Sequence, residues 1–338
     1  MAENKQLTEV PEQSEDKSTG DKGMSKMTLY RRRFLRNKPA VAGLFIFIIL
    51  VILAVFGPFM TGYSIADQDM NTLLDGELRR PAVLINQNAL SDTTLTLLND
   101  PVGYESRGGK GLHFFGTDSS GHDLFAQTMH GLGRSLMIAL SVSICVVIIS
   151  ALVGTGAAYL GGKPEKAILA VIHFLLVIPS FLLIALLVAD SGGDWKVLAL
   201  VLILFGWMYQ SRVIWSLAMS IREREFIAAA RYTGVSGGRI VVRHMIPNIG
   251  SLLIINLTLG VVSAVMSETG LSFLGLGVKI PDVSLGTLLQ QGASSVQSLP
   301  WTFWFPAATV TLLTVSMALI ADGLRDALDP NSAAGGHA

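Results

Sequence analysis

Ionisable side chains are rare in the apolar parts of this 338-residue chain. Arg212, His173, Glu268 and Asp322 lie within or at the ends of long apolar runs. Ionisable groups inside a membrane can relay protons or hold a coupling ion, and such sites usually combine several of them. These four lie far apart in the sequence, and the apolar runs contain no cluster of acids. The pattern therefore does not favour ion-coupled transport chemistry.

Metal and nucleophilic chemistry have little support in the sequence. Cys145 is the only cysteine, so the chain cannot form an internal disulfide or a cysteine-based metal site. His113, His122 and His130 have a spacing that fits no compact metal site. An intramembrane protease would need a buried nucleophile beside a base, and His173 is the only histidine in an apolar run. We expect neither a metal site nor a catalytic site.

The chain also lacks a phosphate-binding loop for ATP. That loop needs a first glycine, then four residues, then Gly-Lys followed by a Ser or Thr hydroxyl. The nearest stretch, Gly162-Lys163-Pro164, has Ala157 at the first glycine position and no hydroxyl after the lysine. We therefore expect ATP hydrolysis, if the chain depends on it, to take place on a separate partner chain.

The composition is that of a membrane protein. Hydrophobic residues make up 51% of the chain and charged residues 15%, against roughly 25% charged in soluble proteins. The formal net charge is +0, which argues against strong binding of nucleic acid. A helix crosses a bilayer with about 20 apolar residues. Six runs are long enough, and they predict an all-α polytopic membrane protein with six transmembrane helices: 40–60, 135–160, 167–189, 197–221, 248–267 and 298–321.

The polar segments between these runs predict the topology. Basic residues gather before the first run, between the second and third, and between the fourth and fifth, which predicts that these segments and both termini are cytoplasmic. The low apolar content of the tail predicts disorder. The predicted domains are a disordered cytoplasmic tail (1–27), a basic segment on anionic lipid headgroups (28–39), the first span (40–60), an extracytoplasmic lobe (61–134), a helical core (135–330) and a flexible C-terminus (331–338).

The cytoplasmic segment at about 222–247 predicts two helices joined by a glycine elbow. Residues 223–233 contain good helix formers without Pro or Gly, and Gly234 suits the left-handed position after a helix. A second helix can begin after Ser236 and run until Pro247. Three alanines flanked by larger apolar side chains would form a short amphipathic knob, which is the shape that docks into a groove of a partner.

This segment resembles the EAA loop of ATP-binding-cassette (ABC) importer permeases. In that motif, Glu-Ala-Ala precedes a glycine and a later Ile-x-Leu-Pro; the glutamate position holds Ala228, with Glu225 as the nearest acid. His244 stands where the general motif has Ile, and His-x-x-Pro-Asn is typical of the dipeptide and oligopeptide subfamily. The resemblance implies that the residues coupling to an ATPase are Glu225, Phe226, Ile227, Ala229, Ala230, Arg231, Gly234, His244 and Pro247.

Three further stretches resemble the C-type permease of the same subfamily, and with the loop they extend the resemblance over roughly residues 28–330. The first is a Gly-Thr-Asp-x-x-Gly-Arg-Asp motif in which His122 replaces the arginine. The second is Leu-Ser-Phe-Leu-Gly-Leu-Gly, and the third is a signature near the C-terminus. The motif residues are Gly116, Thr117, Asp118, Gly121 and Asp123, then Gly275 and Gly277, then Asp322, Arg325 and Asp326.

The resemblance implies the type I importer fold and a non-catalytic, multi-pass subunit of the cell membrane that forms half of a pathway for di- or oligopeptides. It implies a heterodimer with a second permease subunit, two ATP-binding subunits or one fused ATPase, and an extracytoplasmic substrate-binding (lipo)protein. ATP and Mg would bind to the ATPase, and this chain would bind no cofactor.

Polarity alone suggests Asn256, Thr258, Ser263 and Glu268 as pathway residues. Polar residues inside a membrane helix can equally hold helices together, so both roles remain open for these four. The alternatives to a peptide permease are an ion-coupled secondary transporter and an ABC importer permease for another small solute, such as a nickel complex.

Overall fold

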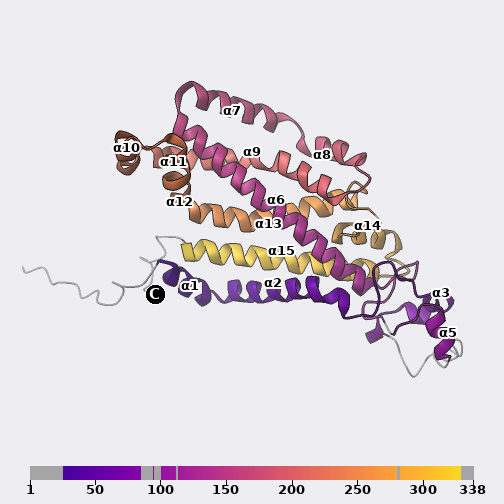
Figure 1. Ribbon diagram of the computed structural model, residues 1–338. Helices are drawn as coiled ribbons and strands as arrows, with labels where there is room; N and C mark the ends of the chain where they lie inside the picture. Colours follow the sequence, from indigo (N-terminus) through magenta and orange to yellow (C-terminus); the bar gives the residue numbers. More distant parts are fainter. Residues whose placement is uncertain (1–25, 85–93, 95–99, 112, 280–281, 329–338) are drawn as a thin grey trace, which may run out of the picture.

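The computed structural model describes residues 26–84, 94, 100–111, 113–279 and 282–328. In these residues the regular secondary structure is helical apart from two isolated β-bridges. Figure 1 shows the long helices running roughly side by side, with α6 crossing the others obliquely. This confirms the predicted all-α membrane fold. The five described helices that are long and apolar enough to span a membrane are α2 (Lys38–Phe56), α6 (Leu124–Leu160), α9 (Trp195–Arg222), α13 (Gly250–Phe273) and α15 (Trp301–Leu328).

A bent pair of helices takes the place of the span predicted at 167–189. α7 (Gly162–Val177) and α8 (Ser180–Ala189) meet at an angle of 72°. Pro179 explains the break, because a residue before proline is driven out of the helical region, and Ile178 is extended with φ −72° and ψ 131°. The expectation of one continuous helix at 167–189 is corrected: this segment is a bent pair, which is the form of a broken span or of a re-entrant loop.

Small residues let α6 pack closely against α9 and α13. A Cβ atom built on Gly154 would lie 2.6 Å from the carbonyl oxygen of Ser211 on α9. A Cβ on Gly260 of α13 would overlap the hydroxyl of Ser143. Glycines at such crossings let the two backbones approach, which is the usual means of helix association in a membrane.

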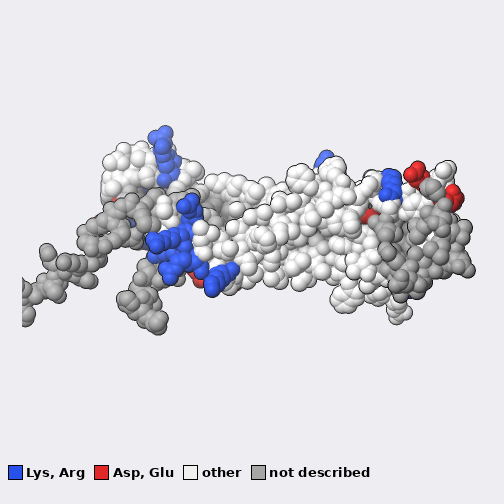
Figure 2. Space-filling view, turned by 90° about the horizontal axis from the view of Figure 1, so that it is seen from below, with Lys and Arg blue, Asp and Glu red and all other residues white. Residues whose placement is uncertain are grey.

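The N-terminal helix α1 (Lys26–Arg36) leads into α2 and lies against α15. Asn37 caps α2 by accepting a hydrogen bond from the Ala40 amide (3.1 Å), and its side-chain amide donates to Asp326 on α15 (2.9 Å). Figure 2 shows Lys and Arg side chains gathered at this end of the molecule, and Asp and Glu side chains at the other. The exposed arginines of α1 include Arg31, Arg32 and Arg36.

The described residues between 57 and 123, called the lobe, lie at one end of the bundle (Figure 1). Phe115 stacks on Phe305 of α15 with ring centroids 4.0 Å apart, and the Trp301 indole donates to the carbonyl of Thr117 (3.0 Å). Helix α6 begins at Leu124, so residues 124–134, predicted as lobe, belong to the helical core. The described lobe helices are η1 (Gly57–Phe59), α3 (Asn71–Leu74), η2 (Gly76–Arg79), η3 (Ala82–Leu84) and α5 (Pro101–Ser106).

The opposite end, called the α10 end, holds the segment predicted as two helices. The second helix runs without a gap from Gly237 to Asn248, with a π-helical turn at Val241–Met245, and it ends one residue after Pro247. A further helix, α14 (Leu285–Ser295), packs on α13 and α15 and was not among the six predicted helices. The elements of the α10 end are α10 (Glu225–Tyr232), α11 (Gly237–Ile240), the π-helical turn η5 (Val241–Met245) and α12 (Ile246–Asn248).

Candidate functional site

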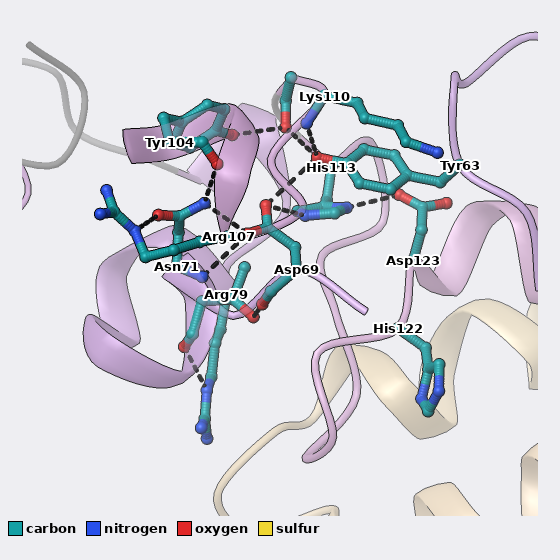
Figure 3. Close-up of polar contacts among 12 residues, drawn as sticks. Tyr63, Asp69, Asn71, Arg79, Tyr104, Arg107, Lys110, His113, His122 and Asp123 are labelled. Carbon is teal, nitrogen blue, oxygen red and sulfur yellow. Dashed lines mark hydrogen bonds and ion pairs between the residues drawn. The ribbon is translucent and has the colours of Figure 1, made fainter. Parts of the chain in front are cut away.

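A buried charge network joins the lobe to the first turn of α6 (Figure 3). Asp123 is fully buried and caps α6 by accepting a hydrogen bond from the Ala126 amide (2.7 Å). The other oxygen of Asp123 lies 2.7 Å from Nδ1 of His113, and Nε2 of His113 lies 3.3 Å from Asp69. One imidazole therefore bridges a carboxylate of the helix and a carboxylate of the lobe.

The surroundings of this network favour its charged form. Burial alone would lower the pKa of His113, but hydrogen bonds to Asp123 and Asp69 outweigh burial and raise that pKa above its ordinary value. Burial alone would raise the pKa of Asp69, but hydrogen bonds from His113 and Asn71 hold it below its ordinary value. Burial also raises the pKa of Tyr63, whose hydroxyl lies 3.2 Å from Asp69. Hydrogen bonds to the two carboxyl groups therefore favour the protonated form of the His113 ring.

The motif around Asp118 shapes the backbone beside this network. Gly116 and Gly121 have φ values of 77° and 83°, and a Cβ on either would lie within 2.8 Å of a lobe carbonyl oxygen. Asp118 accepts hydrogen bonds from the amides two and four residues further along the chain, at 2.8 and 3.0 Å. The Asp118 carboxyl also lies 3.0 Å from the ring of His122, which occupies the motif's arginine position. The motif turns the chain so that Asp123 can enter the core.

A cavity of about 480 Å³ lies beside the network at the lobe end. The turn that holds Asp118 and His122 forms one wall, and α14 forms another. A second cavity of about 210 Å³ lies in the bundle between α6, α8, α9 and α13, and Ser180, the first residue of α8, lines it. Its remaining polar lining comes from Ser143, Gln210, Ser263 and Ser267.

Of the four predicted pathway residues, Ser263 alone lines one of these two cavities. Asn256 is half-buried, and Thr258 is buried with its hydroxyl donating to the Ile254 carbonyl of its own helix (2.9 Å). Glu268 is fully buried and accepts hydrogen bonds from two serine hydroxyls. Of the two roles left open for Glu268, its burial among the described residues favours that of holding helices together.

Helix α10 divides into a buried and an exposed face. Ile227 is 0% exposed and Ala230 is buried, and both pack against a cluster that includes Ile214 of α9 and Ile240 and Met245 beyond the elbow. The other face of α10 is uncovered in this chain. It presents Glu225, Phe226, Ala228, Ala229 and Tyr232, with Tyr232 92% exposed.

The elbow after α10 has the predicted geometry. Gly234 has a φ of 77°, the left-handed conformation that favours glycine. His244 is half-buried within η5, and the side chain of Asn248 donates to its carbonyl (2.6 Å). Pro247 is exposed on α12. The cluster beneath α10 is completed by neighbours of these motif residues, Val241, Met245 and Ile249.

Two arginines attach this end to α6. Arg231 of α10 donates to the carbonyl of Tyr159 (3.2 Å), and its guanidinium lies 4.6 Å from the centre of the Tyr159 ring. Arg222 at the end of α9 donates to the carbonyl of Ala158 (3.0 Å). Carbonyls in the last turn of a helix have no partner within it, and positive charge is favourable there. The two arginines therefore link α10 and α9 to the end of α6.

The remaining motif residues lie just after α13 and in the last turns of α15. Gly275 has a φ of 78° just after α13, and a Cβ on Gly277 would overlap Ser272. Asp322 and Arg325 are exposed on the last turns of α15, where Asp326 accepts the hydrogen bond from Asn37.

The sequence did not lead us to predict that His113 bridges two carboxyl groups, or that serine hydroxyls bind Glu268. His113 had been considered only as a metal ligand. A signal was available in Asp123, which precedes an apolar run as a helix cap, and in Asp69, the other acid that completes the pair. For the serines the signal was Ser284 followed by Thr287, the spacing of a capping box that begins α14.

The side chains considered for ion coupling are not grouped. Arg212 and His173 are both exposed on the surface of this chain. In the described ranges, no group of three or more His, Cys, Asp or Glu side chains has a geometry that could hold a metal ion.

Two protein-family models match the chain. Residues 147–333 match the model described as binding-protein-dependent transport system inner membrane component. Residues 25–81 match the model described as the N-terminal TM domain of oligopeptide transport permease C. The two matches together include α1, α2 and most of the bundle.

Similar proteins cover nearly the whole chain. The oligopeptide transport system permease protein OppC of Mycobacterium tuberculosis is 42% identical over 310 residues, which are 91% of this chain and 96% of that protein. OppC of Escherichia coli K12 is 31% identical over 89% of both chains. The dipeptide transport system permease protein DppC of Bacillus subtilis is 30% identical over 88% of this chain and 84% of that protein.

Proposed function

Because this chain belongs to the family of binding-protein-dependent transport system inner membrane components, we propose that it forms half of the pathway of an ABC importer for peptides. The observation that carries the proposal is the similarity to peptide permeases along nearly the full length of both chains. Similarity over the whole chain includes the lobe and the α10 end, and not only the apolar helices that any membrane protein shares.

The cavity between α6, α8, α9 and α13 is the proposed lining of the pathway. Its polar side chains carry hydroxyls and an amide, from Ser143, Ser180, Gln210, Ser263 and Ser267. Neutral hydrogen-bonding groups suit a peptide backbone, which offers donors and acceptors without a fixed charge. The cavity is about 210 Å³ in a single chain, so a second permease subunit is the proposed source of the facing wall.

Helix α10 is the proposed contact with the ATPase. Its exposed face carries small alanines beside Phe226 and Tyr232, a shape that fits a groove of a partner. Its buried face packs on α9, and Arg231 attaches it to α6. A displacement of α10 would therefore reach two helices that line the pathway. ATP and Mg are proposed to bind to the partner, as separate ATP-binding subunits or one fused chain.

The lobe is the proposed contact with an extracytoplasmic substrate-binding protein, and the α10 end is then cytoplasmic. Exposed basic side chains of α1 support this orientation. The cavity of about 480 Å³ at the lobe end is the proposed entry for cargo.

Replacing Ala229 by Glu tests the coupling role. The position is exposed, so the chain should still insert and fold, but a carboxylate would be buried unpaired in the groove of the ATPase. We expect uptake of a labelled short peptide by the reconstituted importer, and peptide-stimulated ATP hydrolysis, to fall at least about tenfold. Lys163→Glu, which adds a carboxylate at another exposed position of the same end, is the matched control.

Normal uptake by Ala229→Glu would overturn the assignment of α10. Uptake of radioactive nickel in preference to the labelled peptide, by the unaltered importer, would instead overturn the peptide cargo and leave the coupling role intact.

A further inference from the structure

Glu268 is an acid without a counter-ion in the core of this chain. It lies in the last turns of α13, is 0% exposed, and forms no ion pair in the part of the chain that the structure describes. Its Oε2 accepts a hydrogen bond from Ser135 of α6 (3.0 Å), and its Oε1 accepts one from Ser272 of α13 (2.8 Å). Burying such a group is unfavourable unless its hydrogen bonds are made, so this arrangement calls for a role.

The two serines connect Glu268 to the beginning of α14. The Leu285 amide, in the first turn of α14, donates to the hydroxyl of Ser135 (3.3 Å). Ser284, the N-cap of α14, lies with its hydroxyl 3.4 Å from that of Ser272. The N-terminus of a helix carries a partial positive charge, which favours a nearby carboxylate. Three helices therefore meet at one carboxyl group.

Glycines make this meeting possible. A Cβ on Gly286 would lie 2.6 Å from Cβ of Ser272, and a Cβ on Gly131 would lie 3.1 Å from the carbonyl carbon of Ser284. A larger side chain at either position would separate α14 from α13 or from α6. The close approach and the hydrogen bonds thus serve the same contact.

The helix held by this contact forms one wall of the lobe-end cavity. Leu288, Gln291, Gly292, Ser294 and Ser295 of α14 line it. We infer that Glu268 is a positioning residue, which fixes α14 against α6 and α13 and so sets the position of this cavity wall. The inference rests on the proposed function in one respect: the cavity is where cargo enters, so a displaced wall slows transport. The structural part of the inference, that Glu268 fixes the position of α14, concerns the permease chain alone.

Spin-label distances across the cavity test the structural part. Labels at Ser120 on the lobe and Gln291 on α14 are both exposed and line opposite walls, with Cys145 replaced by Ala in every variant. The purified full-length chain in nanodiscs is measured without ATP or cargo. Glu268→Leu keeps the volume and removes both acceptors, so we expect a broader distance distribution with a shifted mean.

Single-serine variants measure the same contact with less risk to folding. Ser135→Ala and Ser272→Ala each remove one hydrogen bond to the carboxyl, and we expect a smaller broadening from each. Ser141→Ala is the matched control on α6, because its hydroxyl bonds only to carbonyls of its own helix (2.7 and 2.9 Å). Glu268→Gln keeps a side-chain oxygen as acceptor, and we expect it to restore most of the narrow distribution.

Peptide uptake tests the functional part of the inference, that a displaced cavity wall slows transport. We expect Glu268→Leu to reduce uptake about tenfold, because it leaves the buried hydroxyls of Ser135 and Ser272 without their acceptor, and Glu268→Gln to recover most of it. An unchanged distance distribution in Glu268→Leu and in both serine variants would overturn the inference, whatever the uptake. A displaced α14 together with absent uptake in the unaltered importer would instead count against the proposed function.

Discussion

The two ends of the bundle differ in their most deeply buried contacts. At the lobe end, His113 lies buried between Asp69 and Asp123, so the lobe and α6 are joined by directional bonds between charged groups. At the α10 end, Ile227 is buried in an apolar cluster, while the opposite face of the same helix is exposed. Charged bonds fix one geometry, whereas apolar packing tolerates small displacements. The difference suggests a rigid lobe end and an α10 end suited to move with a partner.

The largest effect should come from removing the imidazole of the lobe end. His113→Gln can donate to only one of the two carboxylates, so the other stays buried without its partner. Breaking a buried ion pair costs about 3–5 kcal/mol. We expect lost hydrogen–deuterium exchange protection across the lobe and the first turn of α6. His122→Gln is the control, since that half-buried ring pairs with Asp118 near the surface and should have a much smaller effect.

The same network predicts a dependence on pH. Since the pKa of His113 is raised in the folded chain, its contribution to stability is complete below its ordinary value of 6.5 and is lost as the pH rises through the folded pKa. Asp69 has a lowered pKa, so its contribution is lost as the pH falls below its ordinary value of 3.8 through the folded pKa. Protection of the lobe should therefore decline on the alkaline side in the unaltered chain. If His113→Gln shows the same alkaline decline, another group is responsible.

The next largest effect should come from shortening the buried side chain of Ile227 at the α10 end. Ile227→Ala leaves a cavity in the cluster beneath α10, and such truncations cost about 2–5 kcal/mol when the side chain is fully buried. Exchange protection of α10 should fall while the lobe is unaffected. Phe226→Ala is the matched control, because that side chain is 38% exposed and its loss leaves the cluster filled. Equal losses in both variants would contradict the two-faced description of α10.

A smaller effect is expected at the elbow. Gly234→Ala places a Cβ in open space, so its cost is only that of the left-handed backbone with φ 77°, about 1 kcal/mol. Gly238→Ala also meets open space but has no positive φ, and we expect it to be neutral or slightly stabilising. In nanodiscs, the thermal unfolding temperature of Gly234→Ala should be lower than that of Gly238→Ala. A neutral Gly234→Ala would indicate that the elbow relaxes freely.

The sequence was sufficient for features that depend on local patterns. Long apolar runs predicted the membrane helices, and the motif before Gly234 predicted a short helix with a left-handed residue after it. Those features follow from hydropathy, helix propensity and the freedom of glycine, all of which can be read within a few residues. Ala229 and Ala230 were assigned together, yet only the structure separates the exposed one from the buried one.

Features that depend on long-range contacts could not be predicted in the same way. Ser135 and Glu268 are 133 positions apart, and no local pattern indicates that they share a hydrogen bond. Polarity alone therefore left both a pathway role and a helix-holding role open for Glu268. The break at Pro179 was readable, because a proline drives the preceding residue out of the helix, but hydropathy of the whole run concealed it.

The smallest effect should come from removing the charge of Arg231. This variant shows how much of the attachment of α10 depends on charge and how much on apolar packing. Arg231→Gln removes one hydrogen bond to the Tyr159 carbonyl and one contact with its ring. Both are near the surface, where such contacts contribute less than about 1 kcal/mol. We expect a slight loss of exchange protection in α10, well below that of Ile227→Ala, and a larger one at low salt, where screening is weaker. Arg239→Gln on exposed α11 is the control for loss of a positive charge. If Arg231→Gln matched Ile227→Ala, charged bonds would fix the α10 end as firmly as the lobe end, and the contrast between a rigid end and a movable end would be lost.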